Sequence, residues 1–247
     1  MTLLELEGVS KAFAGVRAVR EVSLTVAEGA VVGVMGPNGS GKTTLFHLIA
    51  GALRPDGGSV RLRGRDVTRL SPSRRCAAGV ARTFQYVRPF PALSVLDNVL
   101  VGLLHGRRWA SPDPEGEGHR LLGLVGLDAK ALLPASRLSL LERRWLELAR
   151  ALATHPDLLL LDEFMAGLTP TETADAMAVI RWVKGEGITL MLVEHIVWAL
   201  LDLSDRIVVL NAGEKIADGP PGTVAREPAV VDAYLGKEDR AGSRPRA

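Results

Sequence analysis

The residues with the clearest chemical potential form a glycine-rich loop near the N-terminus. The segment Gly36-Pro37-Asn38-Gly39-Ser40-Gly41-Lys42-Thr43 fits the pattern G-x-x-x-x-G-K-[ST] of a phosphate-binding loop. Its glycines let backbone amides approach phosphate oxygens, and the N-terminus of a following helix also favours an anion. We expect Lys42 to reach the β- and γ-phosphates of a nucleotide and the Thr43 hydroxyl to ligate Mg²⁺. The predicted nucleotide-binding residues of this loop are Gly36, Pro37, Asn38, Gly39, Ser40, Gly41, Lys42, Thr43 and Thr44.

An acidic pair later in the chain supplies a second chemical element. Phosphate-binding loops serve kinases, GTPases, ATPases and transport motors, so the loop alone does not select a reaction. Four leucines at 158–161 predict a buried strand, and Asp162 and Glu163 follow it directly. We expect Asp162 to hold Mg²⁺ and Glu163 to polarise the attacking water, which favours a hydrolase over a kinase. A solvated acidic pair at a strand end is the alternative interpretation.

The N-terminal part of the chain predicts strands around the loop. Apolar and polar residues alternate at 3–9 and 22–26, which is typical of antiparallel strands. The continuous apolar run at 30–35 predicts a strand that is buried on both faces and leads into the loop. Residues 42–50 then predict a helix that ends at Gly51. The loop therefore lies between a strand and a helix, as a phosphate-binding loop requires.

The rest of the chain predicts a helical region and further strands. Residues 86–157 favour helices, with a polar loop at 105–119, and strands return at 158–161 and 188–193. A hairpin is predicted at 205–217. We therefore predict an α/β fold, with a P-loop ATPase core of mainly parallel sheet, N-terminal antiparallel strands and an inserted helical subdomain. The predicted domain covers 1–236, with the helical subdomain at about 86–157, and 237–247 is expected to be a disordered tail.

Composition narrows the class of protein. The chain has 247 residues, and its hydrophobic content of 47% with 23% charged residues is ordinary for a folded domain. The net charge of +2 and the scattered arginines give no reason to expect a nucleic-acid partner. The single cysteine, Cys76, cannot form an internal disulfide, which fits a reducing compartment. No window approaches the roughly 20 apolar residues of a membrane helix, so we expect membrane contact only through a partner.

The order of the motifs resembles that of the ATP-binding subunits of ABC transporters over nearly the whole chain. Gln85 resembles the Q-loop glutamine, which meets Mg²⁺ and water, and His195 resembles the switch histidine that contacts the γ-phosphate. Residues 166–169 resemble the D-loop. Phe13 is placed like the aromatic residue that stacks on adenine, and Val19 lies nearby in the sequence. The resemblance implies catalytic roles for Glu163, His195 and Gln85, metal contacts from Thr43, Gln85 and Asp162, and base contacts from Phe13 and Val19.

Ser139 occupies the position of the family's signature motif, where this sequence departs from the usual pattern. Leu140 and Leu141 stand where the family commonly has two glycines. Ser139 and Glu142 have the spacing of a capping box that opens a helix. In the family this element binds the ATP held by the opposite subunit, which implies a head-to-tail dimer with an identical or paralogous ATPase. A capping box with no ligand is the alternative interpretation.

Several stretches resemble the ATPases of branched-chain, or hydrophobic, amino acid importers in particular. They include 81–85, 88–91, 96–99, 162–168 and 232–236, and Phe164 replaces the proline that most ABC ATPases carry. The resemblance implies an ATP-hydrolysing motor subunit that drives import of branched-chain or other hydrophobic amino acids. An exporter ATPase, an importer ATPase for another small solute such as urea or amides, and a non-transport ABC ATPase acting on nucleic acid are the alternatives.

The resemblance also implies cofactors, partners and a location. ATP and Mg²⁺ are the expected cofactors. The expected partners are membrane permease subunits, a second ATPase subunit and, indirectly, a solute-binding receptor, with no nucleic acid. The chain is then expected at the cytoplasmic face of the cell membrane, held peripherally by the permease subunits.

Overall fold

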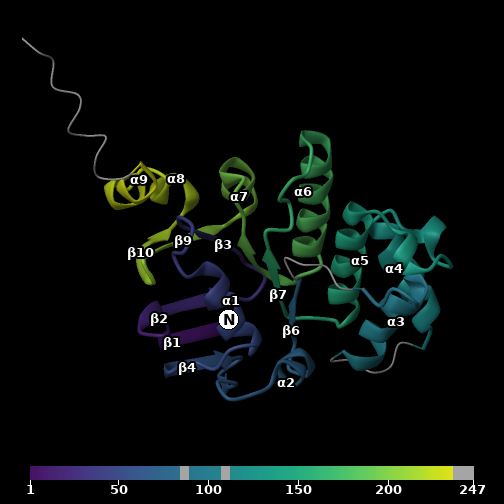
Figure 1. The fold of residues 1–247 in the computed structure, drawn as a ribbon, viewed down its shortest axis with the longest axis horizontal. Helices are drawn as coiled ribbons and strands as arrows, with labels where there is room; N and C mark the ends of the chain where they lie inside the picture. Colours follow the sequence, from purple (N-terminus) through teal and green to yellow (C-terminus); the bar gives the residue numbers. More distant parts are fainter. Residues whose placement is uncertain (84–88, 107–111, 236–247) are drawn as a thin grey trace, which may run out of the picture.

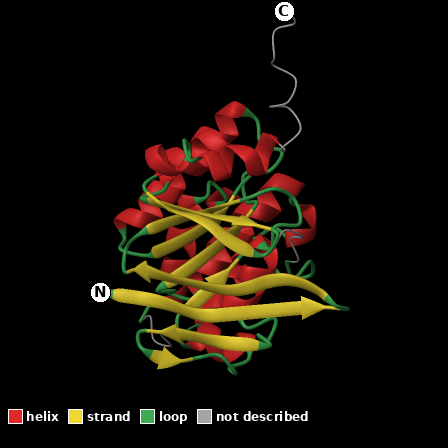
Figure 2. Ribbon diagram, turned by 90° about the vertical axis from the view of Figure 1, so that its left-hand side faces the viewer, coloured by secondary structure: helices red, strands yellow, loops and turns green. Residues whose placement is uncertain are grey.

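The computed structural model describes residues 1–83, 89–106 and 112–235, which form two β-sheets surrounded by helices (Figure 1). The antiparallel sheet has the strand order β2-β1-β4-β5, and the mainly parallel sheet has the order β10-β9-β3-β8-β7-β6. Helices α3, α4 and α5 lie together at one side of the molecule, away from the antiparallel strands (Figure 1). In the side view, the strand that begins at the N-terminus crosses the lower half, with helices above and behind the strands (Figure 2). The predicted fold class is confirmed.

The elements have the following bounds. The strands are β1 (Thr2–Phe13), β2 (Val16–Ala27), β3 (Val31–Met35), β4 (Gly57–Leu62), β5 (Arg65–Asp66), β6 (Val80–Arg82), β7 (Leu158–Asp162), β8 (Thr189–Val193), β9 (Arg206–Asn211) and β10 (Glu214–Gly219). The α-helices are α1 (Lys42–Ala50), α2 (Pro72–Ala77), α3 (Val95–His105), α4 (Pro114–Leu124), α5 (Leu140–Ala153), α6 (Pro170–Gly185), α7 (Val197–Leu203), α8 (Pro221–Val224) and α9 (Pro228–Leu235). Two short 3₁₀ helices in the described ranges are η1 (Asp128–Lys130) and η2 (Ala135–Arg137).

Strand β7 shows why the apolar runs of the sequence become buried parallel strands. Leu159 and Leu161 pack in a cluster with residues of α5, α6 and α7. Leu158 and Leu160 point the other way and pack with α1 and the antiparallel sheet. Successive side chains of a strand face opposite sides of the sheet, so a strand covered on both faces needs an unbroken apolar sequence. The predicted strand is confirmed for this reason.

Helix α1 lies between the two sheets and carries the glycine-rich loop at its N-terminus. Its buried side chains Leu45, Phe46, Leu48 and Ile49 belong to the same cluster as residues of β1 and β2. The helix ends at Gly51, whose left-handed backbone (φ 77°) closes the last turn, as predicted. Burial on all sides therefore fixes the position of the loop relative to both sheets.

A buried arginine holds the other end of α1. Arg75 of α2 is 1% exposed, and its Nη1 donates to the carbonyl oxygens of Leu48 and Ile49 while Nη2 donates to that of Thr68. The last carbonyls of a helix have no intrahelical donors and favour a cation. Burial lowers the pKa of Arg75 to about 10, which reflects the cost of removing its charge from water. Three hydrogen bonds to backbone carbonyl oxygens thus replace the water that the Arg75 guanidinium loses on burial.

The predicted loop at 105–119 is wrong in its second half, because α4 begins at Pro114. The Asp113 side chain accepts a hydrogen bond from the Gly116 amide at 2.9 Å, and proline is favourable in a first turn. Gly118 faces α3 so closely that a Cβ there would lie 2.7 Å from Leu96 Cδ1. Residues that usually favour a loop therefore cap this helix and allow its close packing.

The helices α3, α4 and α5 fall within the interval predicted for the helical subdomain. Its limits at 86 and 157 stay a prediction, and the tail predicted at 237–247 lies outside the described residues. No helix in the described part of the chain is long and apolar enough to cross a lipid bilayer.

Replacing Arg75 with methionine is expected to destabilise the fold around α1. The change keeps an unbranched apolar stem but removes the guanidinium, so the three carbonyl partners lose their donor, which should lower the free energy of unfolding by about 2–3 kcal/mol. Urea unfolding followed by circular dichroism measures this. The matched control is Arg74→Met, which changes an exposed neighbour on the same helix and should stay within about 0.5 kcal/mol of the wild type. Equal effects of the two changes would contradict the role of Arg75.

Candidate functional site

The glycine-rich loop joins the carboxyl end of β3 to α1, and its first and last glycines lie against neighbouring backbone. A Cβ on Gly36 would lie 2.1 Å from the Leu210 carbonyl oxygen, and a Cβ on Gly41 would lie 2.3 Å from that of Ala18. Both glycines also have positive φ values, 147° and 104°. A larger residue would therefore displace the loop from β9 and β2. Close packing, as well as the ligand, requires glycine at these two positions.

Lys42 is folded back into the loop. Its side chain is buried, and Nζ donates hydrogen bonds to the carbonyl oxygens of Gly36 at 2.7 Å and Pro37 at 3.0 Å. Burial lowers the pKa of Lys42, while the nearby carboxylates of Glu163 and Asp162 act in the opposite direction. The fold thus brings together the lysine of the loop and the predicted acidic pair, which lie about half the chain apart in the sequence.

Asp162 lies at the carboxyl end of β7 and forms a buried ion pair. Its Oδ2 accepts a hydrogen bond from Arg82 Nη2 at 2.8 Å, and the exposed fractions of the two side chains are 1% and 6%. Burial raises the pKa of Asp162 and lowers the pKa of Arg82, so desolvation outweighs the attraction of the pair for each group. The sequence gives no role to Arg82 beyond its place just before the Q-loop motif.

The surroundings of Asp162 fit a magnesium ion. Its Oδ1 is buried and has no hydrogen-bond partner among the described residues. Mg²⁺ is usually held by one or two carboxylates together with substrate phosphates and waters, rather than by a full set of protein ligands. Accordingly, the described residues contain no group of three His, Cys, Asp or Glu side chains that could hold a metal ion. Asp162 and Thr43 are the candidates from the described chain, and Gln85 lies outside the described residues.

Glu163 and His195 form a pair at the edge of the site. The Glu163 backbone is left-handed (φ 53°), and its amide donates to the Val193 carbonyl oxygen at 2.8 Å. Glu163 Oε1 lies 2.9 Å from His195 Nε2. The side chain of His195 is half exposed, so a ligand can reach it, whereas only 18% of the Glu163 side chain is exposed. A strained backbone held by a neighbouring strand is characteristic of a residue positioned for function.

Glu194 is a third acidic residue near Asp162 and Glu163, and the sequence motifs predict no role for it. It is 6% exposed, and its Oε1 accepts a hydrogen bond from the Met165 amide at 2.9 Å. Burial raises its pKa to about 7, and the charges of Glu163 and Asp162 add to the effect. Glu194 therefore fixes the turn after Glu163 as a hydrogen-bond acceptor and holds its proton below about pH 7.

The residues predicted to bind the base lie near the end of β1. Phe13 is 44% exposed, and Lys11 Nζ lies 5.7 Å from the centre of its ring. Val19 is buried in β2, beside a hollow of about 550 Å³ that Lys11 and Arg17 also line. An exposed aromatic face suits a stacked base, while the buried Val19 side chain offers little surface. Base contact by both residues stays a prediction.

Ser139 begins α5 in the predicted capping box. Its Oγ accepts a hydrogen bond from the Glu142 amide at 3.2 Å, and the Glu142 carboxylate accepts one from the Ser139 amide at 2.9 Å. Leu140 is 68% exposed at this helix start. Among the described residues, no hydrogen bond joins Ser139 to the glycine-rich loop, whereas Arg144 of the same helix donates to the Ala166 carbonyl oxygen after the acidic pair. The structure therefore brings Lys42, Asp162, Glu163 and His195 together, without Ser139.

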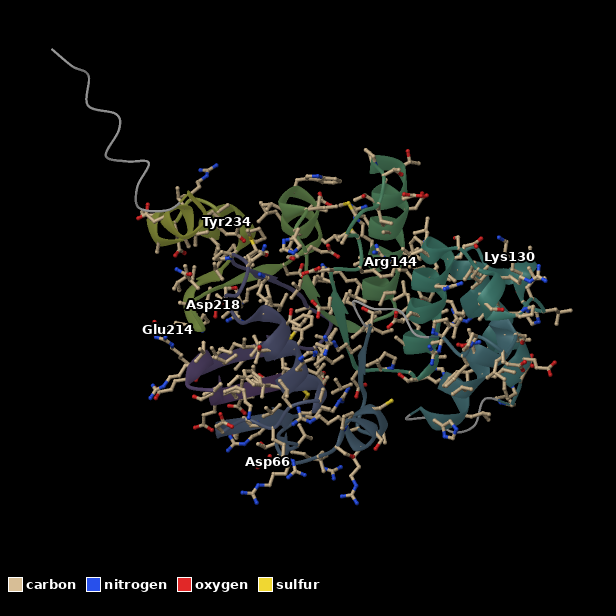
Figure 3. The ribbon with its side chains drawn as sticks, viewed as in Figure 1. Asp66, Lys130, Arg144, Glu214, Asp218 and Tyr234 are labelled. Carbon is tan, nitrogen blue, oxygen red and sulfur yellow. The ribbon has the colours of Figure 1, made fainter. Side chains whose placement is uncertain are left out.

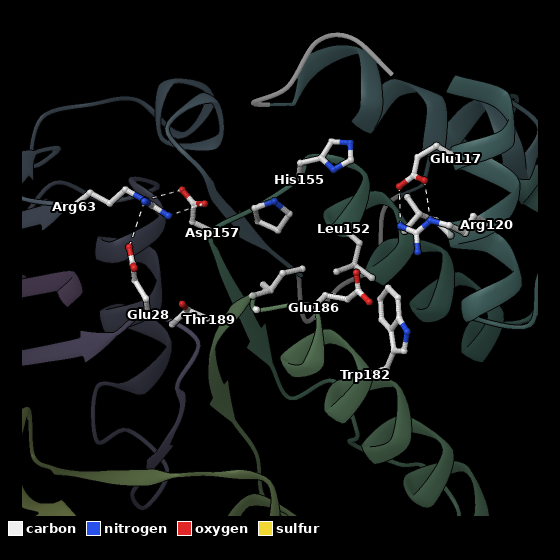
Figure 4. Close-up of a pocket in the computed structure, with 14 residues that line it drawn as sticks. Glu28, Arg63, Glu117, Arg120, Leu152, His155, Asp157, Trp182, Glu186 and Thr189 are labelled. Atoms are coloured by element: carbon white, nitrogen blue, oxygen red, sulfur yellow. Dashed lines mark hydrogen bonds and ion pairs between the residues drawn. The ribbon is translucent and has the colours of Figure 1, made fainter. Parts of the chain in front are cut away.

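A polar cleft of about 360 Å³ lies elsewhere, between the strand core and the helical region (Figure 4). Asp157 and Thr189 line it on one side, and Arg120 and Trp182 on the other. Asp157 precedes β7, whereas Asp162 ends it, so the two are separated by the strand length of roughly 16 Å. In open α/β sheets, ligands bind at the carboxyl ends of the strands. This cleft is therefore separate from the phosphate-loop site.

Comparison with known families gives two matches. Residues 19–166 match the family described as ABC transporter. Residues 214–240 match the family described as Branched-chain amino acid ATP-binding cassette transporter. The first match includes the loop and the acidic pair, and the second includes β10 and α9.

Individual proteins agree with these families. The high-affinity branched-chain amino acid transport ATP-binding protein BraF of Pseudomonas aeruginosa is 37% identical over 95% of this chain and 98% of its own length. LivG of Escherichia coli K12, which has the same description, is 36% identical over the same shares. A solved ATP-binding cassette of an ABC transporter in its ADP conformation has a TM-score of 0.85 and 30% identity, covering 96% of this chain and 100% of that one.

The raised pKa of Glu194 makes stability depend on pH in a specific window. An unfolded glutamate loses its proton near pH 4.5, whereas folded Glu194 does so near pH 7. Its contribution to stability is therefore fully present below about pH 4.5 and is lost as the pH rises through 7, on the order of 3 kcal/mol in total. Glu194→Gln mimics the protonated acid, so the variant should be more stable than the wild type at pH 8 and about equally stable at pH 5.

Urea unfolding at the two pH values, without nucleotide or Mg²⁺, measures this difference. Glu115→Gln is the control, because Glu115 is exposed in the first turn of α4. It should leave the pH dependence of the wild type unchanged. If Glu194→Gln keeps the wild-type pH dependence as well, Glu194 does not titrate in this window.

Proposed function

This chain belongs to the ABC transporter ATP-binding family, and we propose that it is the motor subunit of an importer for branched-chain or other hydrophobic amino acids. The observation that carries the ATPase part is the convergence of Lys42, Asp162, Glu163 and His195 at one edge of the sheet. The names of the relatives and the match of the C-terminal segment support the amino-acid part. ATP is hydrolysed, and its energy drives the transport cycle.

The residues of the loop bind the phosphates of ATP. The loop amides and Lys42 hold the β- and γ-phosphates, which requires Lys42 to exchange the Gly36 and Pro37 carbonyls for phosphate oxygens. The exchange is favourable, because a buried ammonium gains a charged partner in place of neutral ones. Phe13 stacks on the adenine ring. Thr43, Gln85 and Asp162 would hold Mg²⁺, which would neutralise charge on the β- and γ-phosphates.

Glu163 acts as the general base. Its carboxylate accepts a proton from the attacking water as the water adds to the γ-phosphate. His195 orients this carboxylate through the 2.9 Å contact between Nε2 and Oε1, and its half-exposed ring contacts the γ-phosphate. Gln85 is assigned to the water and the metal from its place in the family motif.

The complete catalytic site includes a second ATPase subunit. Among the described residues, no hydrogen bond joins Ser139 to the glycine-rich loop of its own chain, and its exposed helix start is available to another molecule. Two identical or paralogous subunits arranged head to tail would place Ser139 of each against the γ-phosphate of the other. Permease subunits hold this pair at the cytoplasmic face of the membrane, and a solute-binding receptor delivers the amino acid to them.

Replacing Glu163 with glutamine is expected to stop hydrolysis without preventing binding. The amide keeps the size of the side chain but cannot accept the proton of the water, so kcat should fall by about 10²–10⁴-fold. The dissociation constant for ATP with Mg²⁺ should change little. Phosphate release measures kcat, and equilibrium dialysis with labelled ATP measures binding. Glu115→Gln serves as the exposed control, and near-normal turnover of Glu163→Gln would remove Glu163 from the role of base.

The substrate is tested by uptake in cells. Deleting the gene for this chain should abolish most high-affinity uptake of labelled leucine, isoleucine and valine, and the wild-type gene should restore it. The Glu163→Gln gene should not restore it, because transport needs turnover of ATP. Uptake of labelled urea is measured in the same cells. Unchanged amino-acid uptake together with lost urea uptake would replace the amino-acid assignment by the alternative solute.

A further inference from the structure

The first glycine of the phosphate loop is bonded by a residue from the far end of the chain. The Gly36 amide donates a hydrogen bond of 2.8 Å to the Tyr234 hydroxyl, across 198 positions in the sequence. Tyr234 belongs to α9, and Figure 3 shows its position at the edge of the molecule, on this helix. The family match of 214–240 includes Tyr234, but gives it no role. This contact joins the C-terminal segment directly to the loop.

The Gly36 amide has little freedom to find another partner. Gly36 is buried, and its Cα side faces the Leu210 carbonyl oxygen and Ser40 Oγ so closely that no Cβ fits. A buried amide without an acceptor is costly, on the order of a lost hydrogen bond. The Tyr234 hydroxyl supplies that acceptor. It therefore fixes both the position and the direction of the first peptide of the loop.

The same glycine also contacts Lys42. The Gly36 carbonyl oxygen accepts a hydrogen bond from Lys42 Nζ at 2.7 Å. The two polar backbone groups of Gly36 thus connect Tyr234 on one side with the predicted phosphate-binding ammonium on the other. A shift of Gly36 would move the carbonyl that holds Lys42 in place. Tyr234 can therefore influence the lysine without touching it.

Helix α9 is anchored well enough to hold a hydroxyl in place. Val230 is 4% exposed and packs in the same apolar cluster as Leu159 and Leu161 of β7. Helix α9 also packs on β10. Burial raises the pKa of Tyr234, so the phenol stays neutral at physiological pH and accepts the amide hydrogen with an oxygen lone pair. Tyr234 as a whole is 45% exposed. The hydroxyl, in contrast, bonds the amide of a buried glycine, so its removal tests this contact separately from the partial burial of the ring.

We propose that Tyr234 is a positioning residue for the phosphate loop, which it holds in a binding-ready conformation through Gly36. The inference rests on the proposed binding of ATP phosphates by this loop. A loop that is ordered before binding loses less conformational entropy when the nucleotide arrives. The C-terminal segment, beyond the catalytic motifs, thereby contributes to nucleotide affinity.

The test compares Tyr234→Phe with Val230→Ala in the full chain. Tyr234→Phe removes only the hydroxyl and should weaken binding of MgADP on the order of tenfold, as expected for the loss of one partly buried hydrogen bond. Val230→Ala loosens the packing of α9 but leaves the hydroxyl, so it should lower the thermal midpoint and keep the dissociation constant within twofold of the wild type. Isothermal titration calorimetry well below both midpoints measures the binding.

Hydrogen exchange gives a second measurement that general destabilisation of α9 would not reproduce. The peptide that covers the loop should exchange faster in Tyr234→Phe and at the wild-type rate in Val230→Ala. The inference is overturned if Tyr234→Phe binds MgADP within twofold of the wild type, or if both variants lose affinity equally.

Lys42→Ala separates this inference from the proposed function. Lost MgADP binding in Lys42→Ala with normal binding in Tyr234→Phe would overturn only the role of Tyr234. Normal binding in Lys42→Ala would overturn the placement of the nucleotide at this loop, and with it the role of Tyr234.

Discussion

Three carboxyl groups converge at the ends of two adjacent strands, and the structure of the site depends on balancing their repulsion. The parallel register pairs Asp162 with Val193, which brings the acidic residues after β7 next to Glu194 after β8. Like charges this close in a partly desolvated site cannot all stay ionised without partners. Arg82 pairs with Asp162, His195 contacts Glu163, and Glu194 accepts a backbone amide and holds its proton to about pH 7. Each carboxyl group thus has its own means of compensation.

The fold makes this concentration of charge possible because it is rigid where the charges lie. The parallel strands are buried on both faces, so the residues that follow them leave the sheet at one common edge. Helix α1 is enclosed by two sheets, and its loop packs against the backbone of β2 and β9 without space for a side chain at Gly36 or Gly41. Lys42 is therefore held beside the carboxylates before any ligand arrives. The site is ordered by packing first and completed by the nucleotide.

Local sequence patterns predicted the elements that depend on local physics. The bounds of α1, the buried strand of leucines and the capping box at Ser139 follow from periodicity and capping, and all three are confirmed. The roles of Arg82, Glu194 and Tyr234 could not be predicted, because each depends on a partner far away in the sequence: Asp162, Met165 and Gly36. An unpaired charge inside an apolar stretch, such as Glu194 after β8, is the one signal that could have drawn attention to a buried acid.

Electrostatic and hydrogen-bond interactions also connect this acidic edge with α5, the helix that Ser139 caps. Glu147 of α5 is buried. Burial lowers the pKa of Arg82, while Asp162 and, less strongly, the charge of Glu147 act in the opposite direction. Arg82 therefore lies in the field of an acid from β7 and an acid from α5. Arg144 adds a second connection, because it donates to the Ala166 carbonyl oxygen just beyond Glu163. The Arg144 hydrogen bond thus ties α5, with the Ser139 cap at its start, to the acidic edge of the sheet, and Arg82 adds an electrostatic connection. A change of charge beside Asp162 therefore alters the electrostatic balance at Arg82, on which the charges of Asp162 and Glu147 both act.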